Sequence, residues 1–133
     1  MGGRCKAARV LVACGSVVLL AGAALHSMLA YPSVSAALAA SDLSHSLQSA
    51  MRAVFLLVGW DWIVIAIIVL LAGFTETRLR RIVIVFCGVA LLVQTGIMVR
   101  FLGWFTGSET IVAAGLSIVS ADFVFAPSSK LKP

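Results

Sequence analysis

Long apolar runs separated by short polar segments make up most of this chain. The runs cover residues 10–30, 53–74, 82–105 and 109–126. Each is close to the ~20 apolar residues that a helix needs to cross the hydrocarbon core of a bilayer. The pattern therefore predicts an all-α, polytopic integral membrane protein whose four transmembrane helices form an antiparallel bundle.

The polar connections predict how these helices are joined. Pro32 is expected to end the first helix, because proline has no backbone N–H to donate. The Ala-rich segment 33–40 predicts a short extracytoplasmic interfacial helix between spans one and two. The short turn at 75–81 and the break at 106–108 predict that the later helices are antiparallel neighbours. The whole chain, residues 1–133, is expected to form a single membrane domain.

Composition supports a membrane protein and argues against a soluble domain. The 133 residues are 62% hydrophobic and 11% charged, against about half and about a quarter in typical soluble domains. The net charge of +5 does not indicate nucleic-acid binding, because the basic residues are divided among short hydrophilic ends. The expected partners are the lipid bilayer and other membrane protein subunits or a homo-oligomer, with no nucleic acid.

The distribution of basic residues predicts the orientation. With the N-terminus in the cytoplasm, eight of the ten Lys and Arg residues lie inside, and Arg52 and Arg100 lie outside. The inside set is Arg4, Lys6, Arg9, Arg78, Arg80, Arg81, Lys130 and Lys132. Positive charge is enriched on cytoplasmic sides, so we expect a plasma (inner) membrane protein with cytoplasmic N- and C-termini. The first run is longer than the roughly 7–15 apolar residues of a signal peptide, so we expect it to remain as a span.

Polar residues within the apolar runs are the candidates for function, because ionisable groups are costly in hydrocarbon. At about 1.5 Å per residue from the inner boundary, five of them fall in the outer half of a core about 30 Å thick. These five, from all four spans, are His26, Asp61, Gln94, Arg100 and Glu109. Asp42, His45 and Arg52 are expected on the outer face, beyond the core. The pattern predicts a ligand or proton site that opens outward, with interhelical hydrogen bonding as the alternative.

A stripe of small residues on the second span predicts a packing face. The stripe recurs every seven residues, at Gly59, Ala66 and Gly73. Small residues let helix backbones approach closely in membranes. Asp61 lies almost opposite this stripe. If the stripe packs against one neighbour, Asp61 must face another helix, a lumen or a partner protein.

The third and fourth spans carry similar tracks of small residues. Gly96 and Gly103 flank Arg100 on one helix face, so Arg100 is expected to point into the bundle. The track on the fourth span consists of Ala113, Ser117 and Ala121. The two tracks are expected to pack together. Near the inner surface, Asp122 is expected to pair with the arginine-rich turn.

Catalytic motifs are absent from the sequence. It contains no Gly-rich phosphate loop, no HExxH and no GxSxG. Cys5, Cys14 and Cys87 form neither a CxxC nor a metal-ligand pattern. We therefore predict no catalytic residue and no metal site; which cofactor the protein binds, if any, is unknown from the sequence.

These observations leave three classes of function open. The favoured one is an accessory or interaction subunit of a larger membrane assembly, because the chain is small and rich in packing tracks. The first alternative is a small-ligand or proton-coupled carrier or binding protein that uses the polar site in the outer half of the bundle. The second alternative, a membrane redox or metal protein, depends on the histidines and thiols alone.

Overall fold

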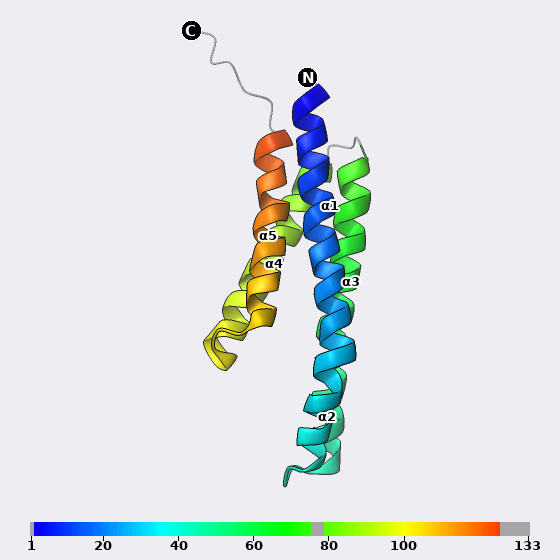
Figure 1. Ribbon diagram of the computed structural model, residues 1–133, viewed down its shortest axis with the longest axis vertical. Helices are drawn as coiled ribbons and strands as arrows, with labels where there is room; N and C mark the ends of the chain where they lie inside the picture. The colour runs from blue at the N-terminus through cyan, green and yellow to red at the C-terminus, as the bar shows by residue number, and fades with distance from the viewer. Residues whose placement is uncertain (1, 76–78, 126–133) are drawn as a thin grey trace.

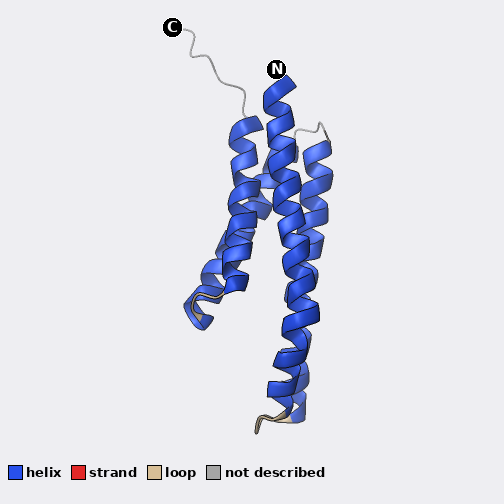
Figure 2. Ribbon diagram, in the orientation of Figure 1, coloured by secondary structure: helices blue, strands red, loops and turns tan. Residues whose placement is uncertain are grey.

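The computed structural model describes residues 2–75 and 79–125, and every element within them is a helix (Figures 1 and 2). The elements are α1 (Gly2–Leu25), a π-helical turn η1 (His26–Ala30), α2 (Tyr31–Ala39), α3 (His45–Phe74), α4 (Leu79–Leu102) and α5 (Thr106–Phe125). Taken together, α1, η1 and α2 form one run. With it, four helical runs are long and apolar enough to cross a membrane. This confirms the prediction of an all-α chain with four helices of spanning length.

The first helix does not end at Pro32. It continues from α1 through η1 into α2, and Tyr31 keeps helical angles of φ −58° and ψ −45°. At the end of η1, the Tyr31 N–H donates to the His26 carbonyl, one residue further back than in an α-helix. This wider turn accommodates Pro32, which has no N–H to donate. The predicted helix end is therefore wrong, and the predicted separate helix at 33–40 is not confirmed, because residues 33–39 continue the first helical run.

The four helical runs form an up-down-up-down bundle (Figure 1). Helix α1 packs between α3 and α5, α5 packs against α4, and the contact between α3 and α4 is the smallest of these four. The core between the helices is aliphatic apart from Trp62 and Cys87; its larger members include Val12, Leu19, Val69, Ile84, Leu91, Ile111 and Ile118. Large apolar side chains are also exposed along α1, α3, α4 and α5. Such a surface agrees with helices that face lipid.

One end of the bundle is extended by two of its helices. The run from α1 to α2 and helix α3 project beyond the turn between α4 and α5, at the end away from the N-terminus (Figure 1). At about 1.5 Å per residue, α3 is about 45 Å long and α5 about 30 Å, and the latter matches the hydrocarbon core of a bilayer. Helix α3 begins at His45, eight residues before the predicted start of the second span at residue 53. The projecting hairpin carries Asp42, His45 and Arg52.

The turn between α4 and α5 forms at Gly103 and not at 106–108. Gly103 has φ +75°, a left-handed conformation that glycine adopts readily, and its N–H donates to the Val99 carbonyl at 2.9 Å. Helix α5 begins at Thr106. The Ser108 hydroxyl secures this start, because it accepts the Phe105 N–H at 3.2 Å and donates to the Phe105 carbonyl at 2.6 Å. The residues predicted to break the helix thus form its first turn.

The small-residue stripe of α3 packs against α1. Gly59, Ala66 and Gly73 are all buried. A Cβ atom added at Gly73 would lie 2.6 Å from Val12 Cγ1, so the two backbones could not come this close with a larger residue. Asp61, on the other side of α3, is exposed.

The predicted contact between the small tracks of α4 and α5 is wrong. A Cβ atom added at Gly96 would meet no atom within 4 Å, and Arg100 is exposed. This face of α4 therefore points away from the bundle and not into it. On α5, the Ser117 hydroxyl donates to the Leu11 carbonyl of α1 at 3.2 Å. The α5 track thus packs partly against α1.

Helices α4 and α5 instead approach closely at Gly88 and Gly115. A Cβ atom added at Gly88 would lie 2.5 Å from Val119 Cγ2 and 3.3 Å from the Gly115 carbonyl oxygen. One added at Gly115 would lie 3.1 Å from Leu92 Cδ2. Glycine at both positions lets the two backbones come together.

Candidate functional site

A group of aromatic and polar side chains joins three helical elements, η1, α3 and α4, in the half of the bundle away from the N-terminus. The His26 Nε2–H donates to the Phe55 carbonyl at 2.8 Å, and because a carbonyl only accepts, this nitrogen carries the hydrogen. The His26 ring also stacks on the Phe55 ring, with centroids 3.8 Å apart and planes 13° apart. The Trp62 ring lies 5.0 Å from the His26 ring, and its Nε1–H donates to Gln94 Oε1 at 3.3 Å. Two predicted site residues, His26 and Gln94, are thus linked through Trp62.

Glycine makes this arrangement possible. A Cβ atom added at Gly59 would lie 2.9 Å from Ser27 Oγ and 3.2 Å from His26 Cδ2, so the side chains of the π turn would have to shift to admit a larger residue. Trp62 is on the same side of α3 as Gly59 and is only 2% exposed. The sequence analysis did not identify Trp62 as part of this group. Its spacing from Gly59 and Ala66, three and four residues, is the signal that identifies it as inward-facing.

A cavity of about 410 Å³ lies beside this group. It opens between the segment from Gly22 to Ala30 of the first helical run and the start of α5. Its lining consists of Gly22, Leu25, His26, Leu29, Ala30, Trp62, Phe105, Gly107 and Thr110. Among the described residues, His26 is the one ionisable group in this lining. A mostly apolar cavity with one or two polar groups is the usual form of a small-molecule site.

The three charged members of the predicted site lie apart from this cavity. Asp61 on α3, Arg100 on α4 and Glu109 on α5 are all exposed, and none of them lines it. The Arg100 guanidinium lies 6.0 Å from the centre of the Phe101 ring. The structure therefore brings together two of the five residues, and a ligand or proton role for the set remains a prediction.

The residues expected on the outer face lie on the projecting hairpin. Asp42 and His45 are exposed at its tip. Arg52 is half-buried, and its Nη2 donates to the Ser35 carbonyl at 3.2 Å. Arg52 therefore connects α3 to α2 through this hydrogen bond.

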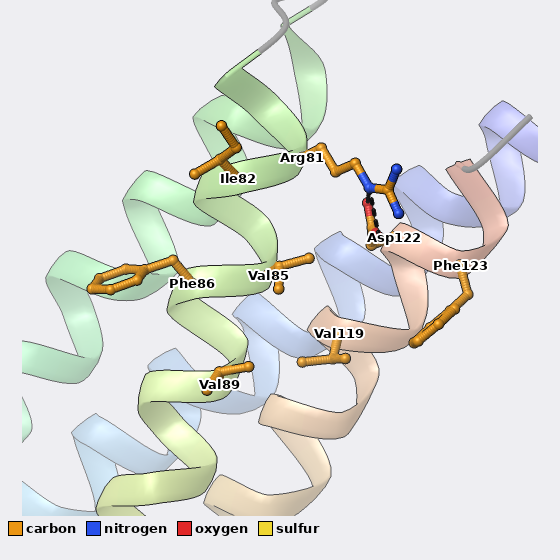
Figure 3. A pocket seen from close by; sticks show the side chains of 8 residues that line it. All are labelled: Arg81, Ile82, Val85, Phe86, Val89, Val119, Asp122 and Phe123. Carbon is orange, nitrogen blue, oxygen red and sulfur yellow. Dashed lines mark hydrogen bonds and ion pairs between the residues drawn. The ribbon is translucent and has the colours of Figure 1, made fainter.

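A second group lies at the opposite end of the bundle, between α4 and α5. Arg81 Nε lies 2.9 Å from Asp122 Oδ1 and 3.0 Å from Oδ2, and it donates its hydrogen bond to Oδ2. The Asp122 side chain is 6% exposed and the Arg81 side chain 66%. Figure 3 shows this pair at the end of a groove. The expected pairing of Asp122 with the arginine-rich turn is confirmed.

The histidine and cysteine residues do not assemble into a metal site within residues 2–75 and 79–125. No group of three or more His, Cys, Asp or Glu side chains in that part of the chain is placed to hold a metal ion. Cys14 is exposed and Cys87 is buried, and both are free thiols. The redox or metal alternative therefore gains no support from the described side chains. Comparison with protein-family models, with curated proteins and with solved structures found no match to this chain.

Proposed function

We propose that this chain is an integral membrane protein that acts as an interaction subunit of a larger membrane assembly. It would lie in the plasma (inner) membrane with both termini in the cytoplasm. The four long apolar helices support insertion, and the basic residues of the first helix and of the start of α4 support the orientation. On this reading the hairpin that projects past α4 and α5 lies on the outer side.

One observation carries the interaction role: Asp61 is an exposed carboxylate on an apolar helix face. Counted from Thr75 at about 1.5 Å per residue, it lies about 21 Å along α3, inside a core about 30 Å thick. A charge at the centre of a spanning helix costs about 2.5–3.5 kcal/mol on insertion scales, and Asp61 lies about 6 Å from that centre. Asp61 makes no hydrogen bond or ion pair with another described residue. A donor or cation on another protein would remove this cost.

The residues around Asp61 have the spacing of a helix-binding surface. They recur at alternating intervals of three and four, at Val54, Leu57, Asp61, Val64, Ile68 and Leu71, which we call the Asp61 face. All of them except the half-buried Val64 are exposed. Intervals that average 3.5 residues keep one stripe against a partner helix, and a single polar residue in such a stripe specifies register and partner. The Asp61 face therefore suits a helix of another subunit or of a second copy.

Replacing Asp61 with leucine tests this role. We expect Asp61→Leu to reduce the amount of assembled complex at least about tenfold, because the partner's polar group would lose its only counterpart. Asp61→Asn, which keeps a hydrogen-bonding side chain, should reduce it less. The measurement is native electrophoresis of membranes solubilised in mild detergent, with tagged and untagged copies co-expressed to separate a homo-oligomer from a complex with other proteins.

Glu109→Leu is the matched control, because it removes an exposed acid from the outer end of α5, away from the Asp61 face. The amount of assembled complex formed by Glu109→Leu should equal that of the wild type. The proposal fails if the wild-type chain migrates alone under conditions that preserve other complexes, or if Asp61→Leu assembles as well as the wild type.

A second candidate function, a small-ligand or proton-coupled carrier, is favoured by the cavity beside His26. On this alternative, liposomes that contain the chain and a pH-sensitive dye acidify faster than empty liposomes. His26→Phe keeps an aromatic ring for the Phe55 stack but removes the titratable nitrogens, so it should abolish the difference. His45→Phe, at the exposed tip of the hairpin, should not. Equal acidification of empty and protein-containing liposomes would contradict proton transport.

A further inference from the structure

An apolar groove with one charged end runs between α4 and α5 (Figure 3). It has a volume of about 580 Å³ and is lined by Arg81, Ile82, Val85, Phe86, Val89, Val119, Asp122 and Phe123. Except for the ion pair at one end, every lining side chain is apolar. Ile82 and Val89 lie about 10 Å apart along α4, so the groove has room for an extended stretch of hydrocarbon.

The two aromatic side chains form exposed walls of this groove. Phe86 on α4 and Phe123 on α5 are among the most exposed large apolar residues of the chain. In Figure 3 both rings stand away from the backbone on either side of the valine floor. Apolar walls around an apolar floor favour a flexible chain over water.

The charged end of the groove offers hydrogen-bond donors. The Arg81 hydrogen bond to Asp122 uses only Nε, and the two terminal nitrogens of the guanidinium make no hydrogen bond with another described residue. Asp122, whose side chain is almost fully buried, holds the Arg81 side chain in place through this ion pair. A guanidinium held in this way presents a planar pair of N–H donors, a geometry that fits phosphate oxygens.

The surroundings of Arg81 are positively charged. Lys6, Arg9 and Arg80 belong to the same end of the bundle, where Asp122 is the one acid among the described residues. Arg80 and Arg9 are partly occupied, since Arg80 Nη1 donates to the Thr75 carbonyl and Arg9 lies over the Phe74 ring. Their charges still attract an anion to this end. Basic pockets between membrane helices on the cytoplasmic side are typical sites for acidic lipid headgroups.

We propose that this groove binds an anionic phospholipid, with an acyl chain along Ile82, Phe86 and Val89 and the phosphate on Arg81. The proposal depends on the membrane placement given above but not on any protein partner. It assigns Arg81 two contacts at once: Asp122 holds Nε, and the lipid phosphate takes the outer nitrogens.

The test compares lipid retention by variants of the full chain. Each is placed in nanodiscs of phosphatidylcholine and phosphatidylglycerol and then released into detergent, and native mass spectrometry counts the lipids that remain bound. The wild type should prefer phosphatidylglycerol. Arg81→Gln alone leaves a buried acid without its cation, so the informative pair is Asp122→Asn and Arg81→Gln/Asp122→Asn. These two differ only at Arg81, and the second should show about a fivefold weaker preference.

Three controls separate the parts of the site. Val89→Trp fills the groove and should reduce retention of both lipids, whereas Val93→Trp, one turn further along α4 and outside the lining, should not. Arg100→Gln removes an exposed arginine from the other end of α4 and should leave the preference intact. Glycerol phosphate, a headgroup without acyl chains, should not displace the lipid.

Any of three results would overturn the proposal. The first is equal retention of the two lipids by the wild type. The second is a preference that survives in Arg81→Gln/Asp122→Asn. The third is displacement by glycerol phosphate at the concentration of the lipid, which would indicate a site for soluble phosphate compounds. Because the chain is tested without other subunits, failure here says nothing about the Asp61 face.

Discussion

Replacing Gly88 with alanine is expected to destabilise the bundle by about 2 kcal/mol, a typical cost of overpacking. The new Cβ atom would lie 2.5 Å from Val119 Cγ2 and 3.2 Å from the Val119 nitrogen. Valine cannot turn aside, because a β-branched side chain in a helix has one strongly preferred rotamer. The helices α4 and α5 would therefore have to separate. Titration with a denaturing detergent, followed by circular dichroism, measures the change in the free energy of unfolding.

Gly96→Ala is the matched control for this variant, on the same helix. Nothing lies within 4 Å of a Cβ atom added there, and alanine is a better helix former than glycine by up to about 1 kcal/mol. Replacement of glycine with alanine should thus lower the free energy of unfolding at position 88 and raise it at position 96. If both variants changed stability in the same direction, the assignment of the Gly88 face to the α5 contact would be wrong.

Replacing Arg81 with leucine is expected to cost about 3 kcal/mol of stability, because it leaves the nearly buried Asp122 carboxylate without its cation. Asp122→Leu removes the same ion pair but should cost less than about 1 kcal/mol. Its partner Arg81 is 66% exposed and can turn to water or lipid headgroups. The detergent titration used for Gly88 measures both.

The double variant Arg81→Leu/Asp122→Leu completes the cycle. With both charges removed, no buried ion is left, and the stability should return to within about 1 kcal/mol of the wild type. The coupling energy of the cycle then gives the interaction between Arg81 and Asp122, separately from what each side chain contributes by itself. Equal costs for the two single variants would contradict the asymmetric burial of this pair.

Hydropathy predicts the cores of the helices better than their ends. The predicted second span and α3 both end at Phe74, because the polar turn follows at once. The first helix passes Pro32 through a single π turn that comes directly before Tyr31, whose N–H donates to the His26 carbonyl. Whether a helix widens into a π turn depends on how it packs against its neighbours, so the local sequence does not reveal such a turn.

Rotation of each helix about its axis was the harder prediction. On α4, glycines occur on two faces, and the sequence does not distinguish Gly88, which meets α5, from Gly96, which meets nothing. Because the Gly96 face was predicted to be the packing face, Arg100 was predicted to point into the bundle, whereas it is exposed. On α3 the small stripe is unambiguous, and it places Trp62 inside and Trp60 outside.

The candidate site was predictable only in part for the same reason. Depth along a helix follows from residue number, and two of the residues predicted to lie at one level, His26 and Gln94, both contact Trp62. Whether side chains at one level meet depends on rotation, and this separates Asp61 from His26. The Arg81 and Asp122 pair was found because the charge of a buried acid must be balanced nearby.

The large contact between α1 and α5 constrains the order in which this protein can mature. The Ser117 hydroxyl on α5 bonds to the Leu11 carbonyl on α1, 106 residues earlier. During synthesis the first helix is made long before its main neighbour, so the side of α1 on which Gly15 meets Ile118 stays uncovered until α5 is in place. Contacts between such distant segments slow folding. A chain truncated before α5 would lack the largest interface of its first helix.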